Sequence, residues 1–91
     1  WNIQIMKLSE VINYATNHNR FLSFLKQRDI NPDSAHEILG KITNETDSTI
    51  EHRIYIDFGN KGQSSKDVRI IVDYNKITQD FNLIQIDNPE R

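Results

Sequence analysis

Two alternating apolar runs joined by a polar loop constrain the fold of this chain more than any other feature. The alternating residues are Ile54, Ile56 and Phe58 in the first run and Val68, Ile70, Val72 and Tyr74 in the second. Because successive side chains of a strand point to opposite faces, this period predicts two antiparallel strands that each bury one face. The connecting loop, residues 59–66 (GNKGQSSK), is long for a hairpin, and we expect it to be mobile.

A third apolar run, residues 77–86 (ITQDFNLIQI), follows a tight turn that we predict at residues 74–76. Its apolar positions change parity between Leu83 and Ile84, which predicts either a bulge or a strand that is buried on both sides. Residues 1–6 (WNIQIM) could add a further edge strand.

The N-terminal third has helical periodicity instead. Apolar residues recur at helical spacing from Ser9 to about Gln27, with a polar interruption at residues 17–19. We therefore expect one long helix, or two short helices broken at the interruption. Ser9 is the expected N-cap, and Leu8 just before it is a possible partner in a hydrophobic staple.

A further helix is predicted after Asn31, which can cap it, with Pro32 at the first helical position. Its apolar stripe, at i, i+3, i+4 and i+7 spacing, comprises Ala35, Ile38, Leu39 and Ile42. Gly40 is the expected C-terminal stop. The fold class that follows is α+β, with two N-terminal helices packed on one face of an antiparallel three- to four-stranded meander.

Length and composition limit the class of protein. The 91 residues make a single domain, residues 1–91, and the absence of cysteine excludes a disulfide scaffold and a thiolate metal site. No apolar run approaches the roughly 20 residues that span a bilayer, and the N-terminus lacks the pattern of a signal peptide. Because residue 1 is Trp and the only Met is Met6, we expect a C-terminal fragment of a longer polypeptide.

The face of the hairpin opposite the predicted core carries polar side chains, and two interpretations are open. These side chains are Arg53, Tyr55, Asp57, Arg69 and Asp73. In the first interpretation the face is solvated and its arginines and aspartates form cross-strand ion pairs. In the second it is a phosphate site, where arginines stabilise a developing phosphorane charge and a Tyr or His moves protons.

The three histidines suggest no metal site, because they show no repeated spacing with other ligand residues. His52 has the parity of the core and is predicted to be a structural, partly buried residue. His18 is expected on a solvated helix surface or facing the open sheet edge, and His36 is expected to be exposed. No dinucleotide fingerprint or phosphate loop occurs, so no cofactor is predicted.

The segments FLKQRDINPDSAHEIL, RIYIDFG and DVRIIVDYNKITQDFNLIQI resemble, in element order and pattern, the small toxin nucleases of the barnase, EndoU, colicin and RelE group. Many of these are C-terminal tips of contact-dependent growth inhibition or other polymorphic toxin proteins. The resemblance spans about residues 21–86 and rests on the pattern of strand, glycine-rich loop, R-I-I-V-D, turn and strand. It implies a metal-independent ribonuclease acting on tRNA in the cytoplasm of a target cell, held in check by a cognate immunity protein or antitoxin.

The resemblance also implies roles for individual residues in the attack of a ribose 2′-hydroxyl on the adjacent phosphate, which leaves a cyclic phosphate. The catalytic candidates are Arg53 and Arg69 for phosphate stabilisation and Tyr55 or His18 for proton transfer, and the RNA-binding candidates are Arg20, Lys76 and Thr78.

The charge balance favours a different class. Eleven basic and 13 acidic residues give a net charge of -2, whereas proteins that bind nucleic acid through phosphates usually carry a basic excess. The alternative is a non-enzymatic, cytoplasmic binding module, such as an immunity or antitoxin-like protein, because charge complementarity speeds association with a basic partner.

Overall fold

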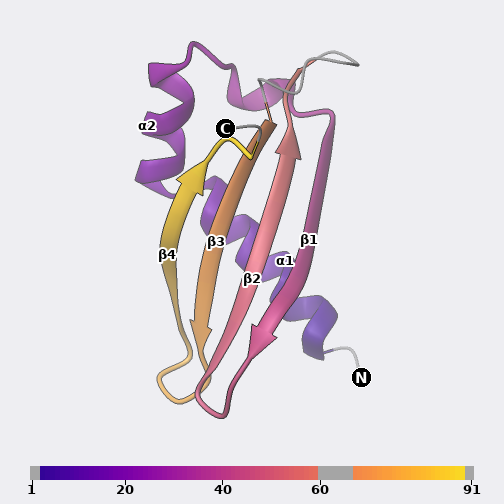
Figure 1. The fold of residues 1–91 in the computed structure, drawn as a ribbon, viewed down its shortest axis with the longest axis vertical. Helices are drawn as coiled ribbons and strands as arrows, with labels where there is room; N and C mark the ends of the chain where they lie inside the picture. Colours follow the sequence, from indigo (N-terminus) through magenta and orange to yellow (C-terminus); the bar gives the residue numbers. More distant parts are fainter. Residues whose placement is uncertain (1–2, 60–66, 90–91) are drawn as a thin grey trace.

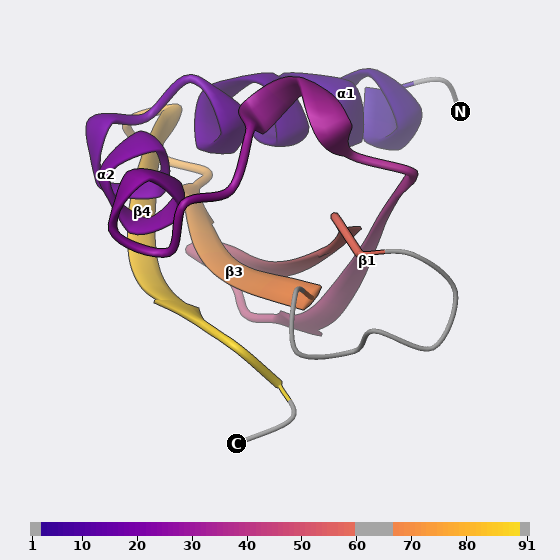
Figure 2. The ribbon, with the colours of Figure 1, turned by 90° about the horizontal axis from the view of Figure 1, so that it is seen from above.

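The computed structural model describes residues 3–59 and 67–89, with the backbone alone over residues 3–7. The elements are α1 (Ile3–Thr16), α2 (Asn19–Gln27), a 3-10 turn (Pro32–Ser34), β1 (Glu37–Glu45), β2 (Thr49–Asp57), β3 (Asp67–Asn75) and β4 (Asp80–Asp87). The strands form one antiparallel sheet in the order β1-β2-β3-β4, and both helices lie on the same side of it (Figures 1 and 2). The predicted α+β class, with helices on one face of a meander, is confirmed.

The core lies between the helices and the even-numbered face of the hairpin formed by β2 and β3. Helix α1 crosses the sheet diagonally and contacts all four strands, while α2 lies beside β4 (Figure 1). The core cluster comprises Val11, Ala15, Phe21, Leu25, Ile30, Ile54, Ile56, Phe58, Val68, Ile70, Val72 and Leu83. The predicted parity of the two central strands is therefore confirmed. His52 shares this face and is buried, as its parity predicts.

The strand register confirms the predicted bulge in the last strand. Ile71 pairs with Gln85 and Val72 with Leu83, so Ile84 is the extra residue. Leu83 is buried and Ile84 is exposed, which is why the apolar parity changes between them. The turn into β4 comes later than predicted, at residues 76–79. Of the predicted mobile loop, residues 60–66 lie outside the described residues.

Two short helices, not one, form the N-terminal third, and the break falls at the predicted polar interruption. Helix α2 ends in a Schellman motif, because the N–H of Ile30 donates to the Leu25 carbonyl (2.9 Å) and Asp29 adopts a left-handed φ of 57°. Two N-terminal predictions are wrong. Helix α1 begins at Ile3, so Ser9 is not its N-cap and residues 3–6 are helical, while residues 1–2 of the expected edge strand lie outside the described residues.

The predicted helix after Asn31 is wrong, because residues 37–45 form the edge strand β1. Only Ile38, Ile42 and Thr43 among its nine residues are β-branched. Pairing with residues 50–57 of β2, which is a tertiary contact, outweighs the helical spacing. Gly40 is therefore not a helix stop. It lies beneath α1, where an added Cβ would be 2.8 Å from the Cδ1 of Leu8, so the missing side chain lets α1 approach β1 closely.

Candidate functional site

The open face of the sheet, opposite the helices, carries most of the candidate site. Its charged residues, placed by parity and register, are Glu37 and Lys41 from β1, Glu51, Arg53 and Asp57 from β2, Asp67, Arg69 and Asp73 from β3, and Asp80 and Asp87 from β4. Carboxylates outnumber cations among them. The face therefore differs from the basic surface that is typical of phosphate recognition.

The structure brings three of the four catalytic candidates together on this face. Tyr55 pairs directly with Arg69 across the two central strands, and Arg53 lies two residues from Tyr55 on the same face of β2. The guanidinium of Arg69 is already engaged, because its Nε and Nη2 donate to the two carboxylate oxygens of Asp87 in β4. The hydrogen bond from Arg69 lowers the pKa of Asp87. This bidentate pair neutralises Arg69 within the sheet.

Arg53 also faces a carboxylate. Its Nε lies 3.8 Å from Oε1 of Glu51, and the same oxygen accepts a hydrogen bond from the hydroxyl of Thr43 (2.7 Å). Glu51 pairs across the sheet with Asp73, and burial, followed by the charge of Glu51, raises the pKa of Asp73. On this part of the face Arg53 therefore has an acidic partner, whereas Glu51 and Asp73 are like charges directly opposite each other.

The fourth catalytic candidate, His18, lies on the helix side of the sheet and does not join the cluster. It is the N-cap of α2, where its Nδ1 accepts a hydrogen bond from the N–H of Arg20 (3.0 Å). Its ring packs edge-on against Tyr14, with 5.4 Å between centroids. The prediction of a solvated helix residue or one facing the open edge is therefore replaced by a half-buried capping residue.

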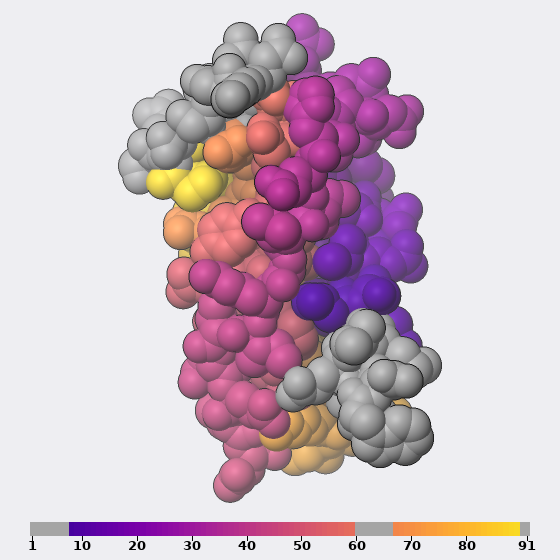
Figure 3. Space-filling view, turned by 90° about the vertical axis from the view of Figure 1, so that its right-hand side faces the viewer, coloured from indigo at the N-terminus to yellow at the C-terminus, as the bar shows by residue number. Residues whose placement is uncertain are grey.

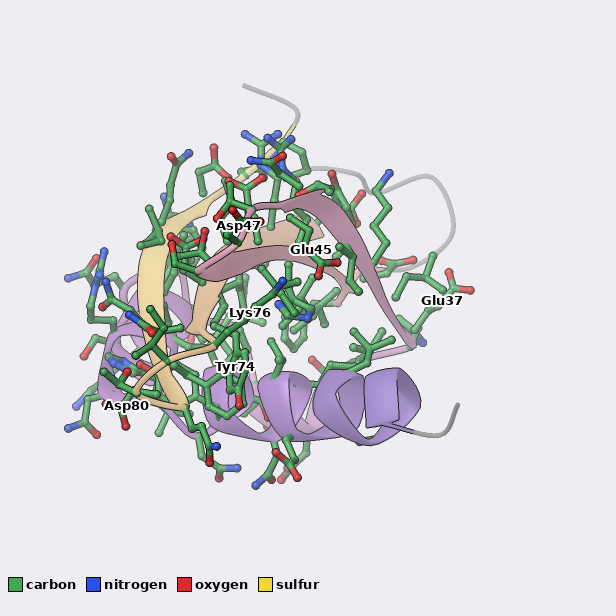
Figure 4. The ribbon with its side chains drawn as sticks, turned by 90° about the horizontal axis from the view of Figure 1, so that it is seen from below. Glu37, Glu45, Asp47, Tyr74, Lys76 and Asp80 are labelled. Atoms are coloured by element: carbon green, nitrogen blue, oxygen red, sulfur yellow. The ribbon has the colours of Figure 1, made fainter. Side chains whose placement is uncertain are left out.

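The RNA-binding candidates lie apart from the cluster and from one another. Nη1 of Arg20 donates to the main-chain carbonyl of Leu83 in β4 (2.9 Å). Lys76 forms an ion pair with Glu45 (2.6 Å) at the lower end of the sheet (Figure 4). The N–H of Thr78 donates to the side-chain oxygen of Asn75 in the β3–β4 turn.

The strand register shows how far the β3–β4 turn lies from the cluster of Arg53, Tyr55 and Arg69. Asn75, just before Lys76, pairs with Thr49, whereas Arg69 pairs with Tyr55, six positions further along β2. At ~3.3 Å per residue, the two levels are roughly 20 Å apart. Lys76 and Thr78 therefore do not contribute to a site around Arg53, Tyr55 and Arg69.

Three carboxylates form a row across the upper end of the open face. Asp57 is opposite Glu37 on one side and Asp67 on the other, so β1, β2 and β3 each contribute one acid at the same level. Beside the row lies a shallow hollow of about 200 Å³, whose apolar lining includes Leu39 and Tyr55. Oδ1 of Asp57 also accepts a hydrogen bond from the N–H of Gly59 (3.0 Å). The three acids concentrate negative charge at this end of the face.

The sequence did not indicate the β1 part of this face, because Glu37, Leu39 and Lys41 were assigned to a helix. The composition of the segment gave little signal for a strand, because only three of its nine residues are β-branched. The residues that the structure describes contain no group of three acidic or histidine side chains that could hold a metal ion. Within the same residues, the helices are too short and too polar to cross a bilayer.

Comparisons with known proteins add no assignment: no protein family, curated protein sequence or solved structure matches this chain.

Proposed function

We propose that this domain is a non-enzymatic protein-binding module, of the immunity or antitoxin-like kind, whose open sheet face binds a basic partner. The observation that carries this proposal is the excess of carboxylates on the face, where Arg53 and Arg69 each already face an acid. A phosphate backbone would be repelled by such a surface, whereas a basic protein would be attracted to it.

The row of Glu37, Asp57 and Asp67 gives the partner a specific place to bind. Three carboxylates at one level concentrate negative charge at this end of the face, and a partner's Lys or Arg head group would be attracted to it. The aliphatic stem of the same side chain would lie against Leu39 and Tyr55 in the adjoining hollow.

The test is affinity capture from an extract of the source organism with matched charge variants. The double variant Asp57→Asn, Asp67→Asn keeps side-chain shape and removes two carboxylates of the row. The control is Asp33→Asn, Asp47→Asn, which removes two exposed acids from a 3-10 turn and a hairpin tip. We expect a basic protein to be captured by the parent and the control and to be lost, or released at lower salt, with the double variant. Equal capture by all three proteins would contradict the proposed face.

A second candidate function is the metal-independent ribonuclease of a toxin domain, acting on tRNA. It is favoured by the gathering of Arg53, Tyr55 and Arg69, and by Nε of Arg53, which is buried and makes no hydrogen bond within the described residues. Such a domain would act in the cytoplasm of a target cell and would need an immunity protein or antitoxin.

The nuclease is tested by incubating the purified domain with total tRNA in EDTA and separating the products on a denaturing gel. Discrete fragments that disappear with Arg69→Ala would replace the binding-module proposal with the nuclease. Intact tRNA, together with unimpaired expression of the domain without a partner, would support the binding module.

A further inference from the structure

The β1 edge of the sheet is open to pairing with another strand. In Figure 3, which views the molecule from this side, β1 runs down the surface and no described segment lies over most of its length. Its apolar residues Ile38, Leu39 and Ile42 are 42%, 57% and 37% exposed. An edge strand presents a row of main-chain donors and acceptors, and exposed apolar side chains beside them make such an edge a template for strand addition.

The opposite edge, β4, is protected. Helix α2 lies beside it (Figure 1), and Arg20 of that helix donates to the main-chain carbonyl of Leu83. The bulge at Ile84 also interrupts its regular pairing geometry. Protection at one edge and exposure at the other make β1 the place where the sheet can be extended.

We propose that β1 pairs antiparallel with β1 of a second copy of this chain, with Leu39 opposite Leu39 on the two-fold axis. In this register Glu37 of each copy is directly opposite Lys41 of the other. The three residues share the open face because they alternate along the strand. Within the described residues neither Glu37 nor Lys41 forms an ion pair, so pairing with the other copy would break none. Nζ of Lys41 lies over the ring of Tyr55, 5.5 Å from its centroid.

Charge complementarity selects this register over its neighbours. Pairing about Lys41 would place Lys41 opposite itself, a pair of like charges, and would extend the pairing into the bulge after Ile42. If the two-fold axis passed through Gly40, no acidic residue would lie across from a basic one. The bulge between Ile42 and Asn44 confines regular pairing to the first part of β1. The two β1 strands therefore pair over their first parts only, and the remainder of each strand extends past the other. The result is one continuous sheet with the helices of both copies on the same side.

Cysteine cross-linking tests the contact directly, because the chain contains no cysteine. Directly opposite residues of antiparallel strands have Cα atoms about 4.5–5.5 Å apart, within disulfide range. We expect Leu39→Cys to form a disulfide dimer under mild oxidation much faster than Ile77→Cys, a control residue that is 77% exposed in the β3–β4 turn. Faster cross-linking of Lys41→Cys than of Leu39→Cys would overturn the register.

A charge swap provides a second test by light scattering from micromolar to near-millimolar protein. Glu37→Lys and Lys41→Glu should each weaken the dimer roughly tenfold, since each change turns two attractions into repulsions. The double variant should restore the affinity of the parent. A monomer at every concentration, or a dimer that none of these variants affects, would overturn the proposal. Either result leaves the proposed basic partner open, because that test uses Asp57 and Asp67.

Discussion

The two faces of the β2–β3 hairpin come from the same strands but have different roles. The even-numbered face meets the helices with apolar side chains, among which only His52 is polar and buried. The odd-numbered face carries arginines and carboxylates from neighbouring strands, most of them half-buried. Burial of apolar area dominates stability, whereas partly exposed ion pairs contribute little. The fold therefore depends mainly on the helix-covered face, and the proposed function is assigned to the other.

Among the substitutions that test this difference between the two faces, the loss of a core side chain should have the largest effect on stability. Ile54→Ala should lower the free energy of unfolding by about 3 kcal/mol, because Ile54 is fully buried at the centre of the even-numbered face. The control Ile84→Ala removes an exposed side chain and should change stability by less than about 0.5 kcal/mol. Denaturant unfolding measures both. Equal losses would contradict the assignment of stability to the helix-covered face.

The next effect concerns the contact between α1 and β1. Gly40→Val should cost about 2 kcal/mol, because its side chain would collide with Leu8. Gly40→Ala should cost less, since the nearest atom is the end of a flexible side chain. In a Leu8→Ala background the cost of Gly40→Val should fall. An unchanged cost in the double-mutant cycle would show that α1 does not pack on Gly40.

On the open face, Asp87→Asn should cost about 1 kcal/mol at neutral pH through loss of the charge-assisted pair with Arg69. Because the pKa of Asp87 is lowered in the folded state, this contribution is complete above the ordinary aspartate pKa. It is lost as the pH falls through the lowered value. The difference between parent and variant should therefore vanish in acid, as measured by denaturant unfolding across pH. The control Asp80→Asn changes an exposed acid, and a similar loss there would contradict the specific role of Asp87.

The smallest effect has the opposite sign. Asp73→Asn should raise stability by about 0.5 kcal/mol at neutral pH, because it removes a charge that burial disfavours and that Glu51, directly across the strands, repels. The pKa of Asp73 is raised in the folded state, so the penalty in the parent is complete above that raised value and absent below the ordinary one. The gain should therefore disappear as the pH is lowered. Destabilisation at neutral pH would show that the carboxylate makes a favourable contact instead.

The sequence predicted the central hairpin well and the edge strand poorly, for a physical reason. In β2 and β3, the alternation of core residues at every second position fits a strand and does not fit a helix. The positions of Arg53, Tyr55 and Arg69 on one face therefore followed from parity alone. In β1, Ile38 and Ile42 are four residues apart, a spacing that fits one face of a helix and one face of a strand equally. Pairing with β2, which is a tertiary contact, decided between them.

The partners of the site residues could not be predicted from parity. The contact of Arg69 with Asp87 depends on the register of β4, which the bulge at Ile84 shifts by one residue. The capping role of His18 depends on where the helix break falls within the polar segment, and a difference of one residue would have removed it.

The hydrogen bond from Arg20 to Leu83 has a consequence for higher-order assembly. A sheet with two free edges can add molecules at both sides and grow without limit into a filament. Here helix α2 occupies one side, so growth by strand addition can begin only at the other, and it ends once two such edges have met. In the proposed assembly, the contact of Arg20 with Leu83 would therefore favour a closed dimer over an open filament.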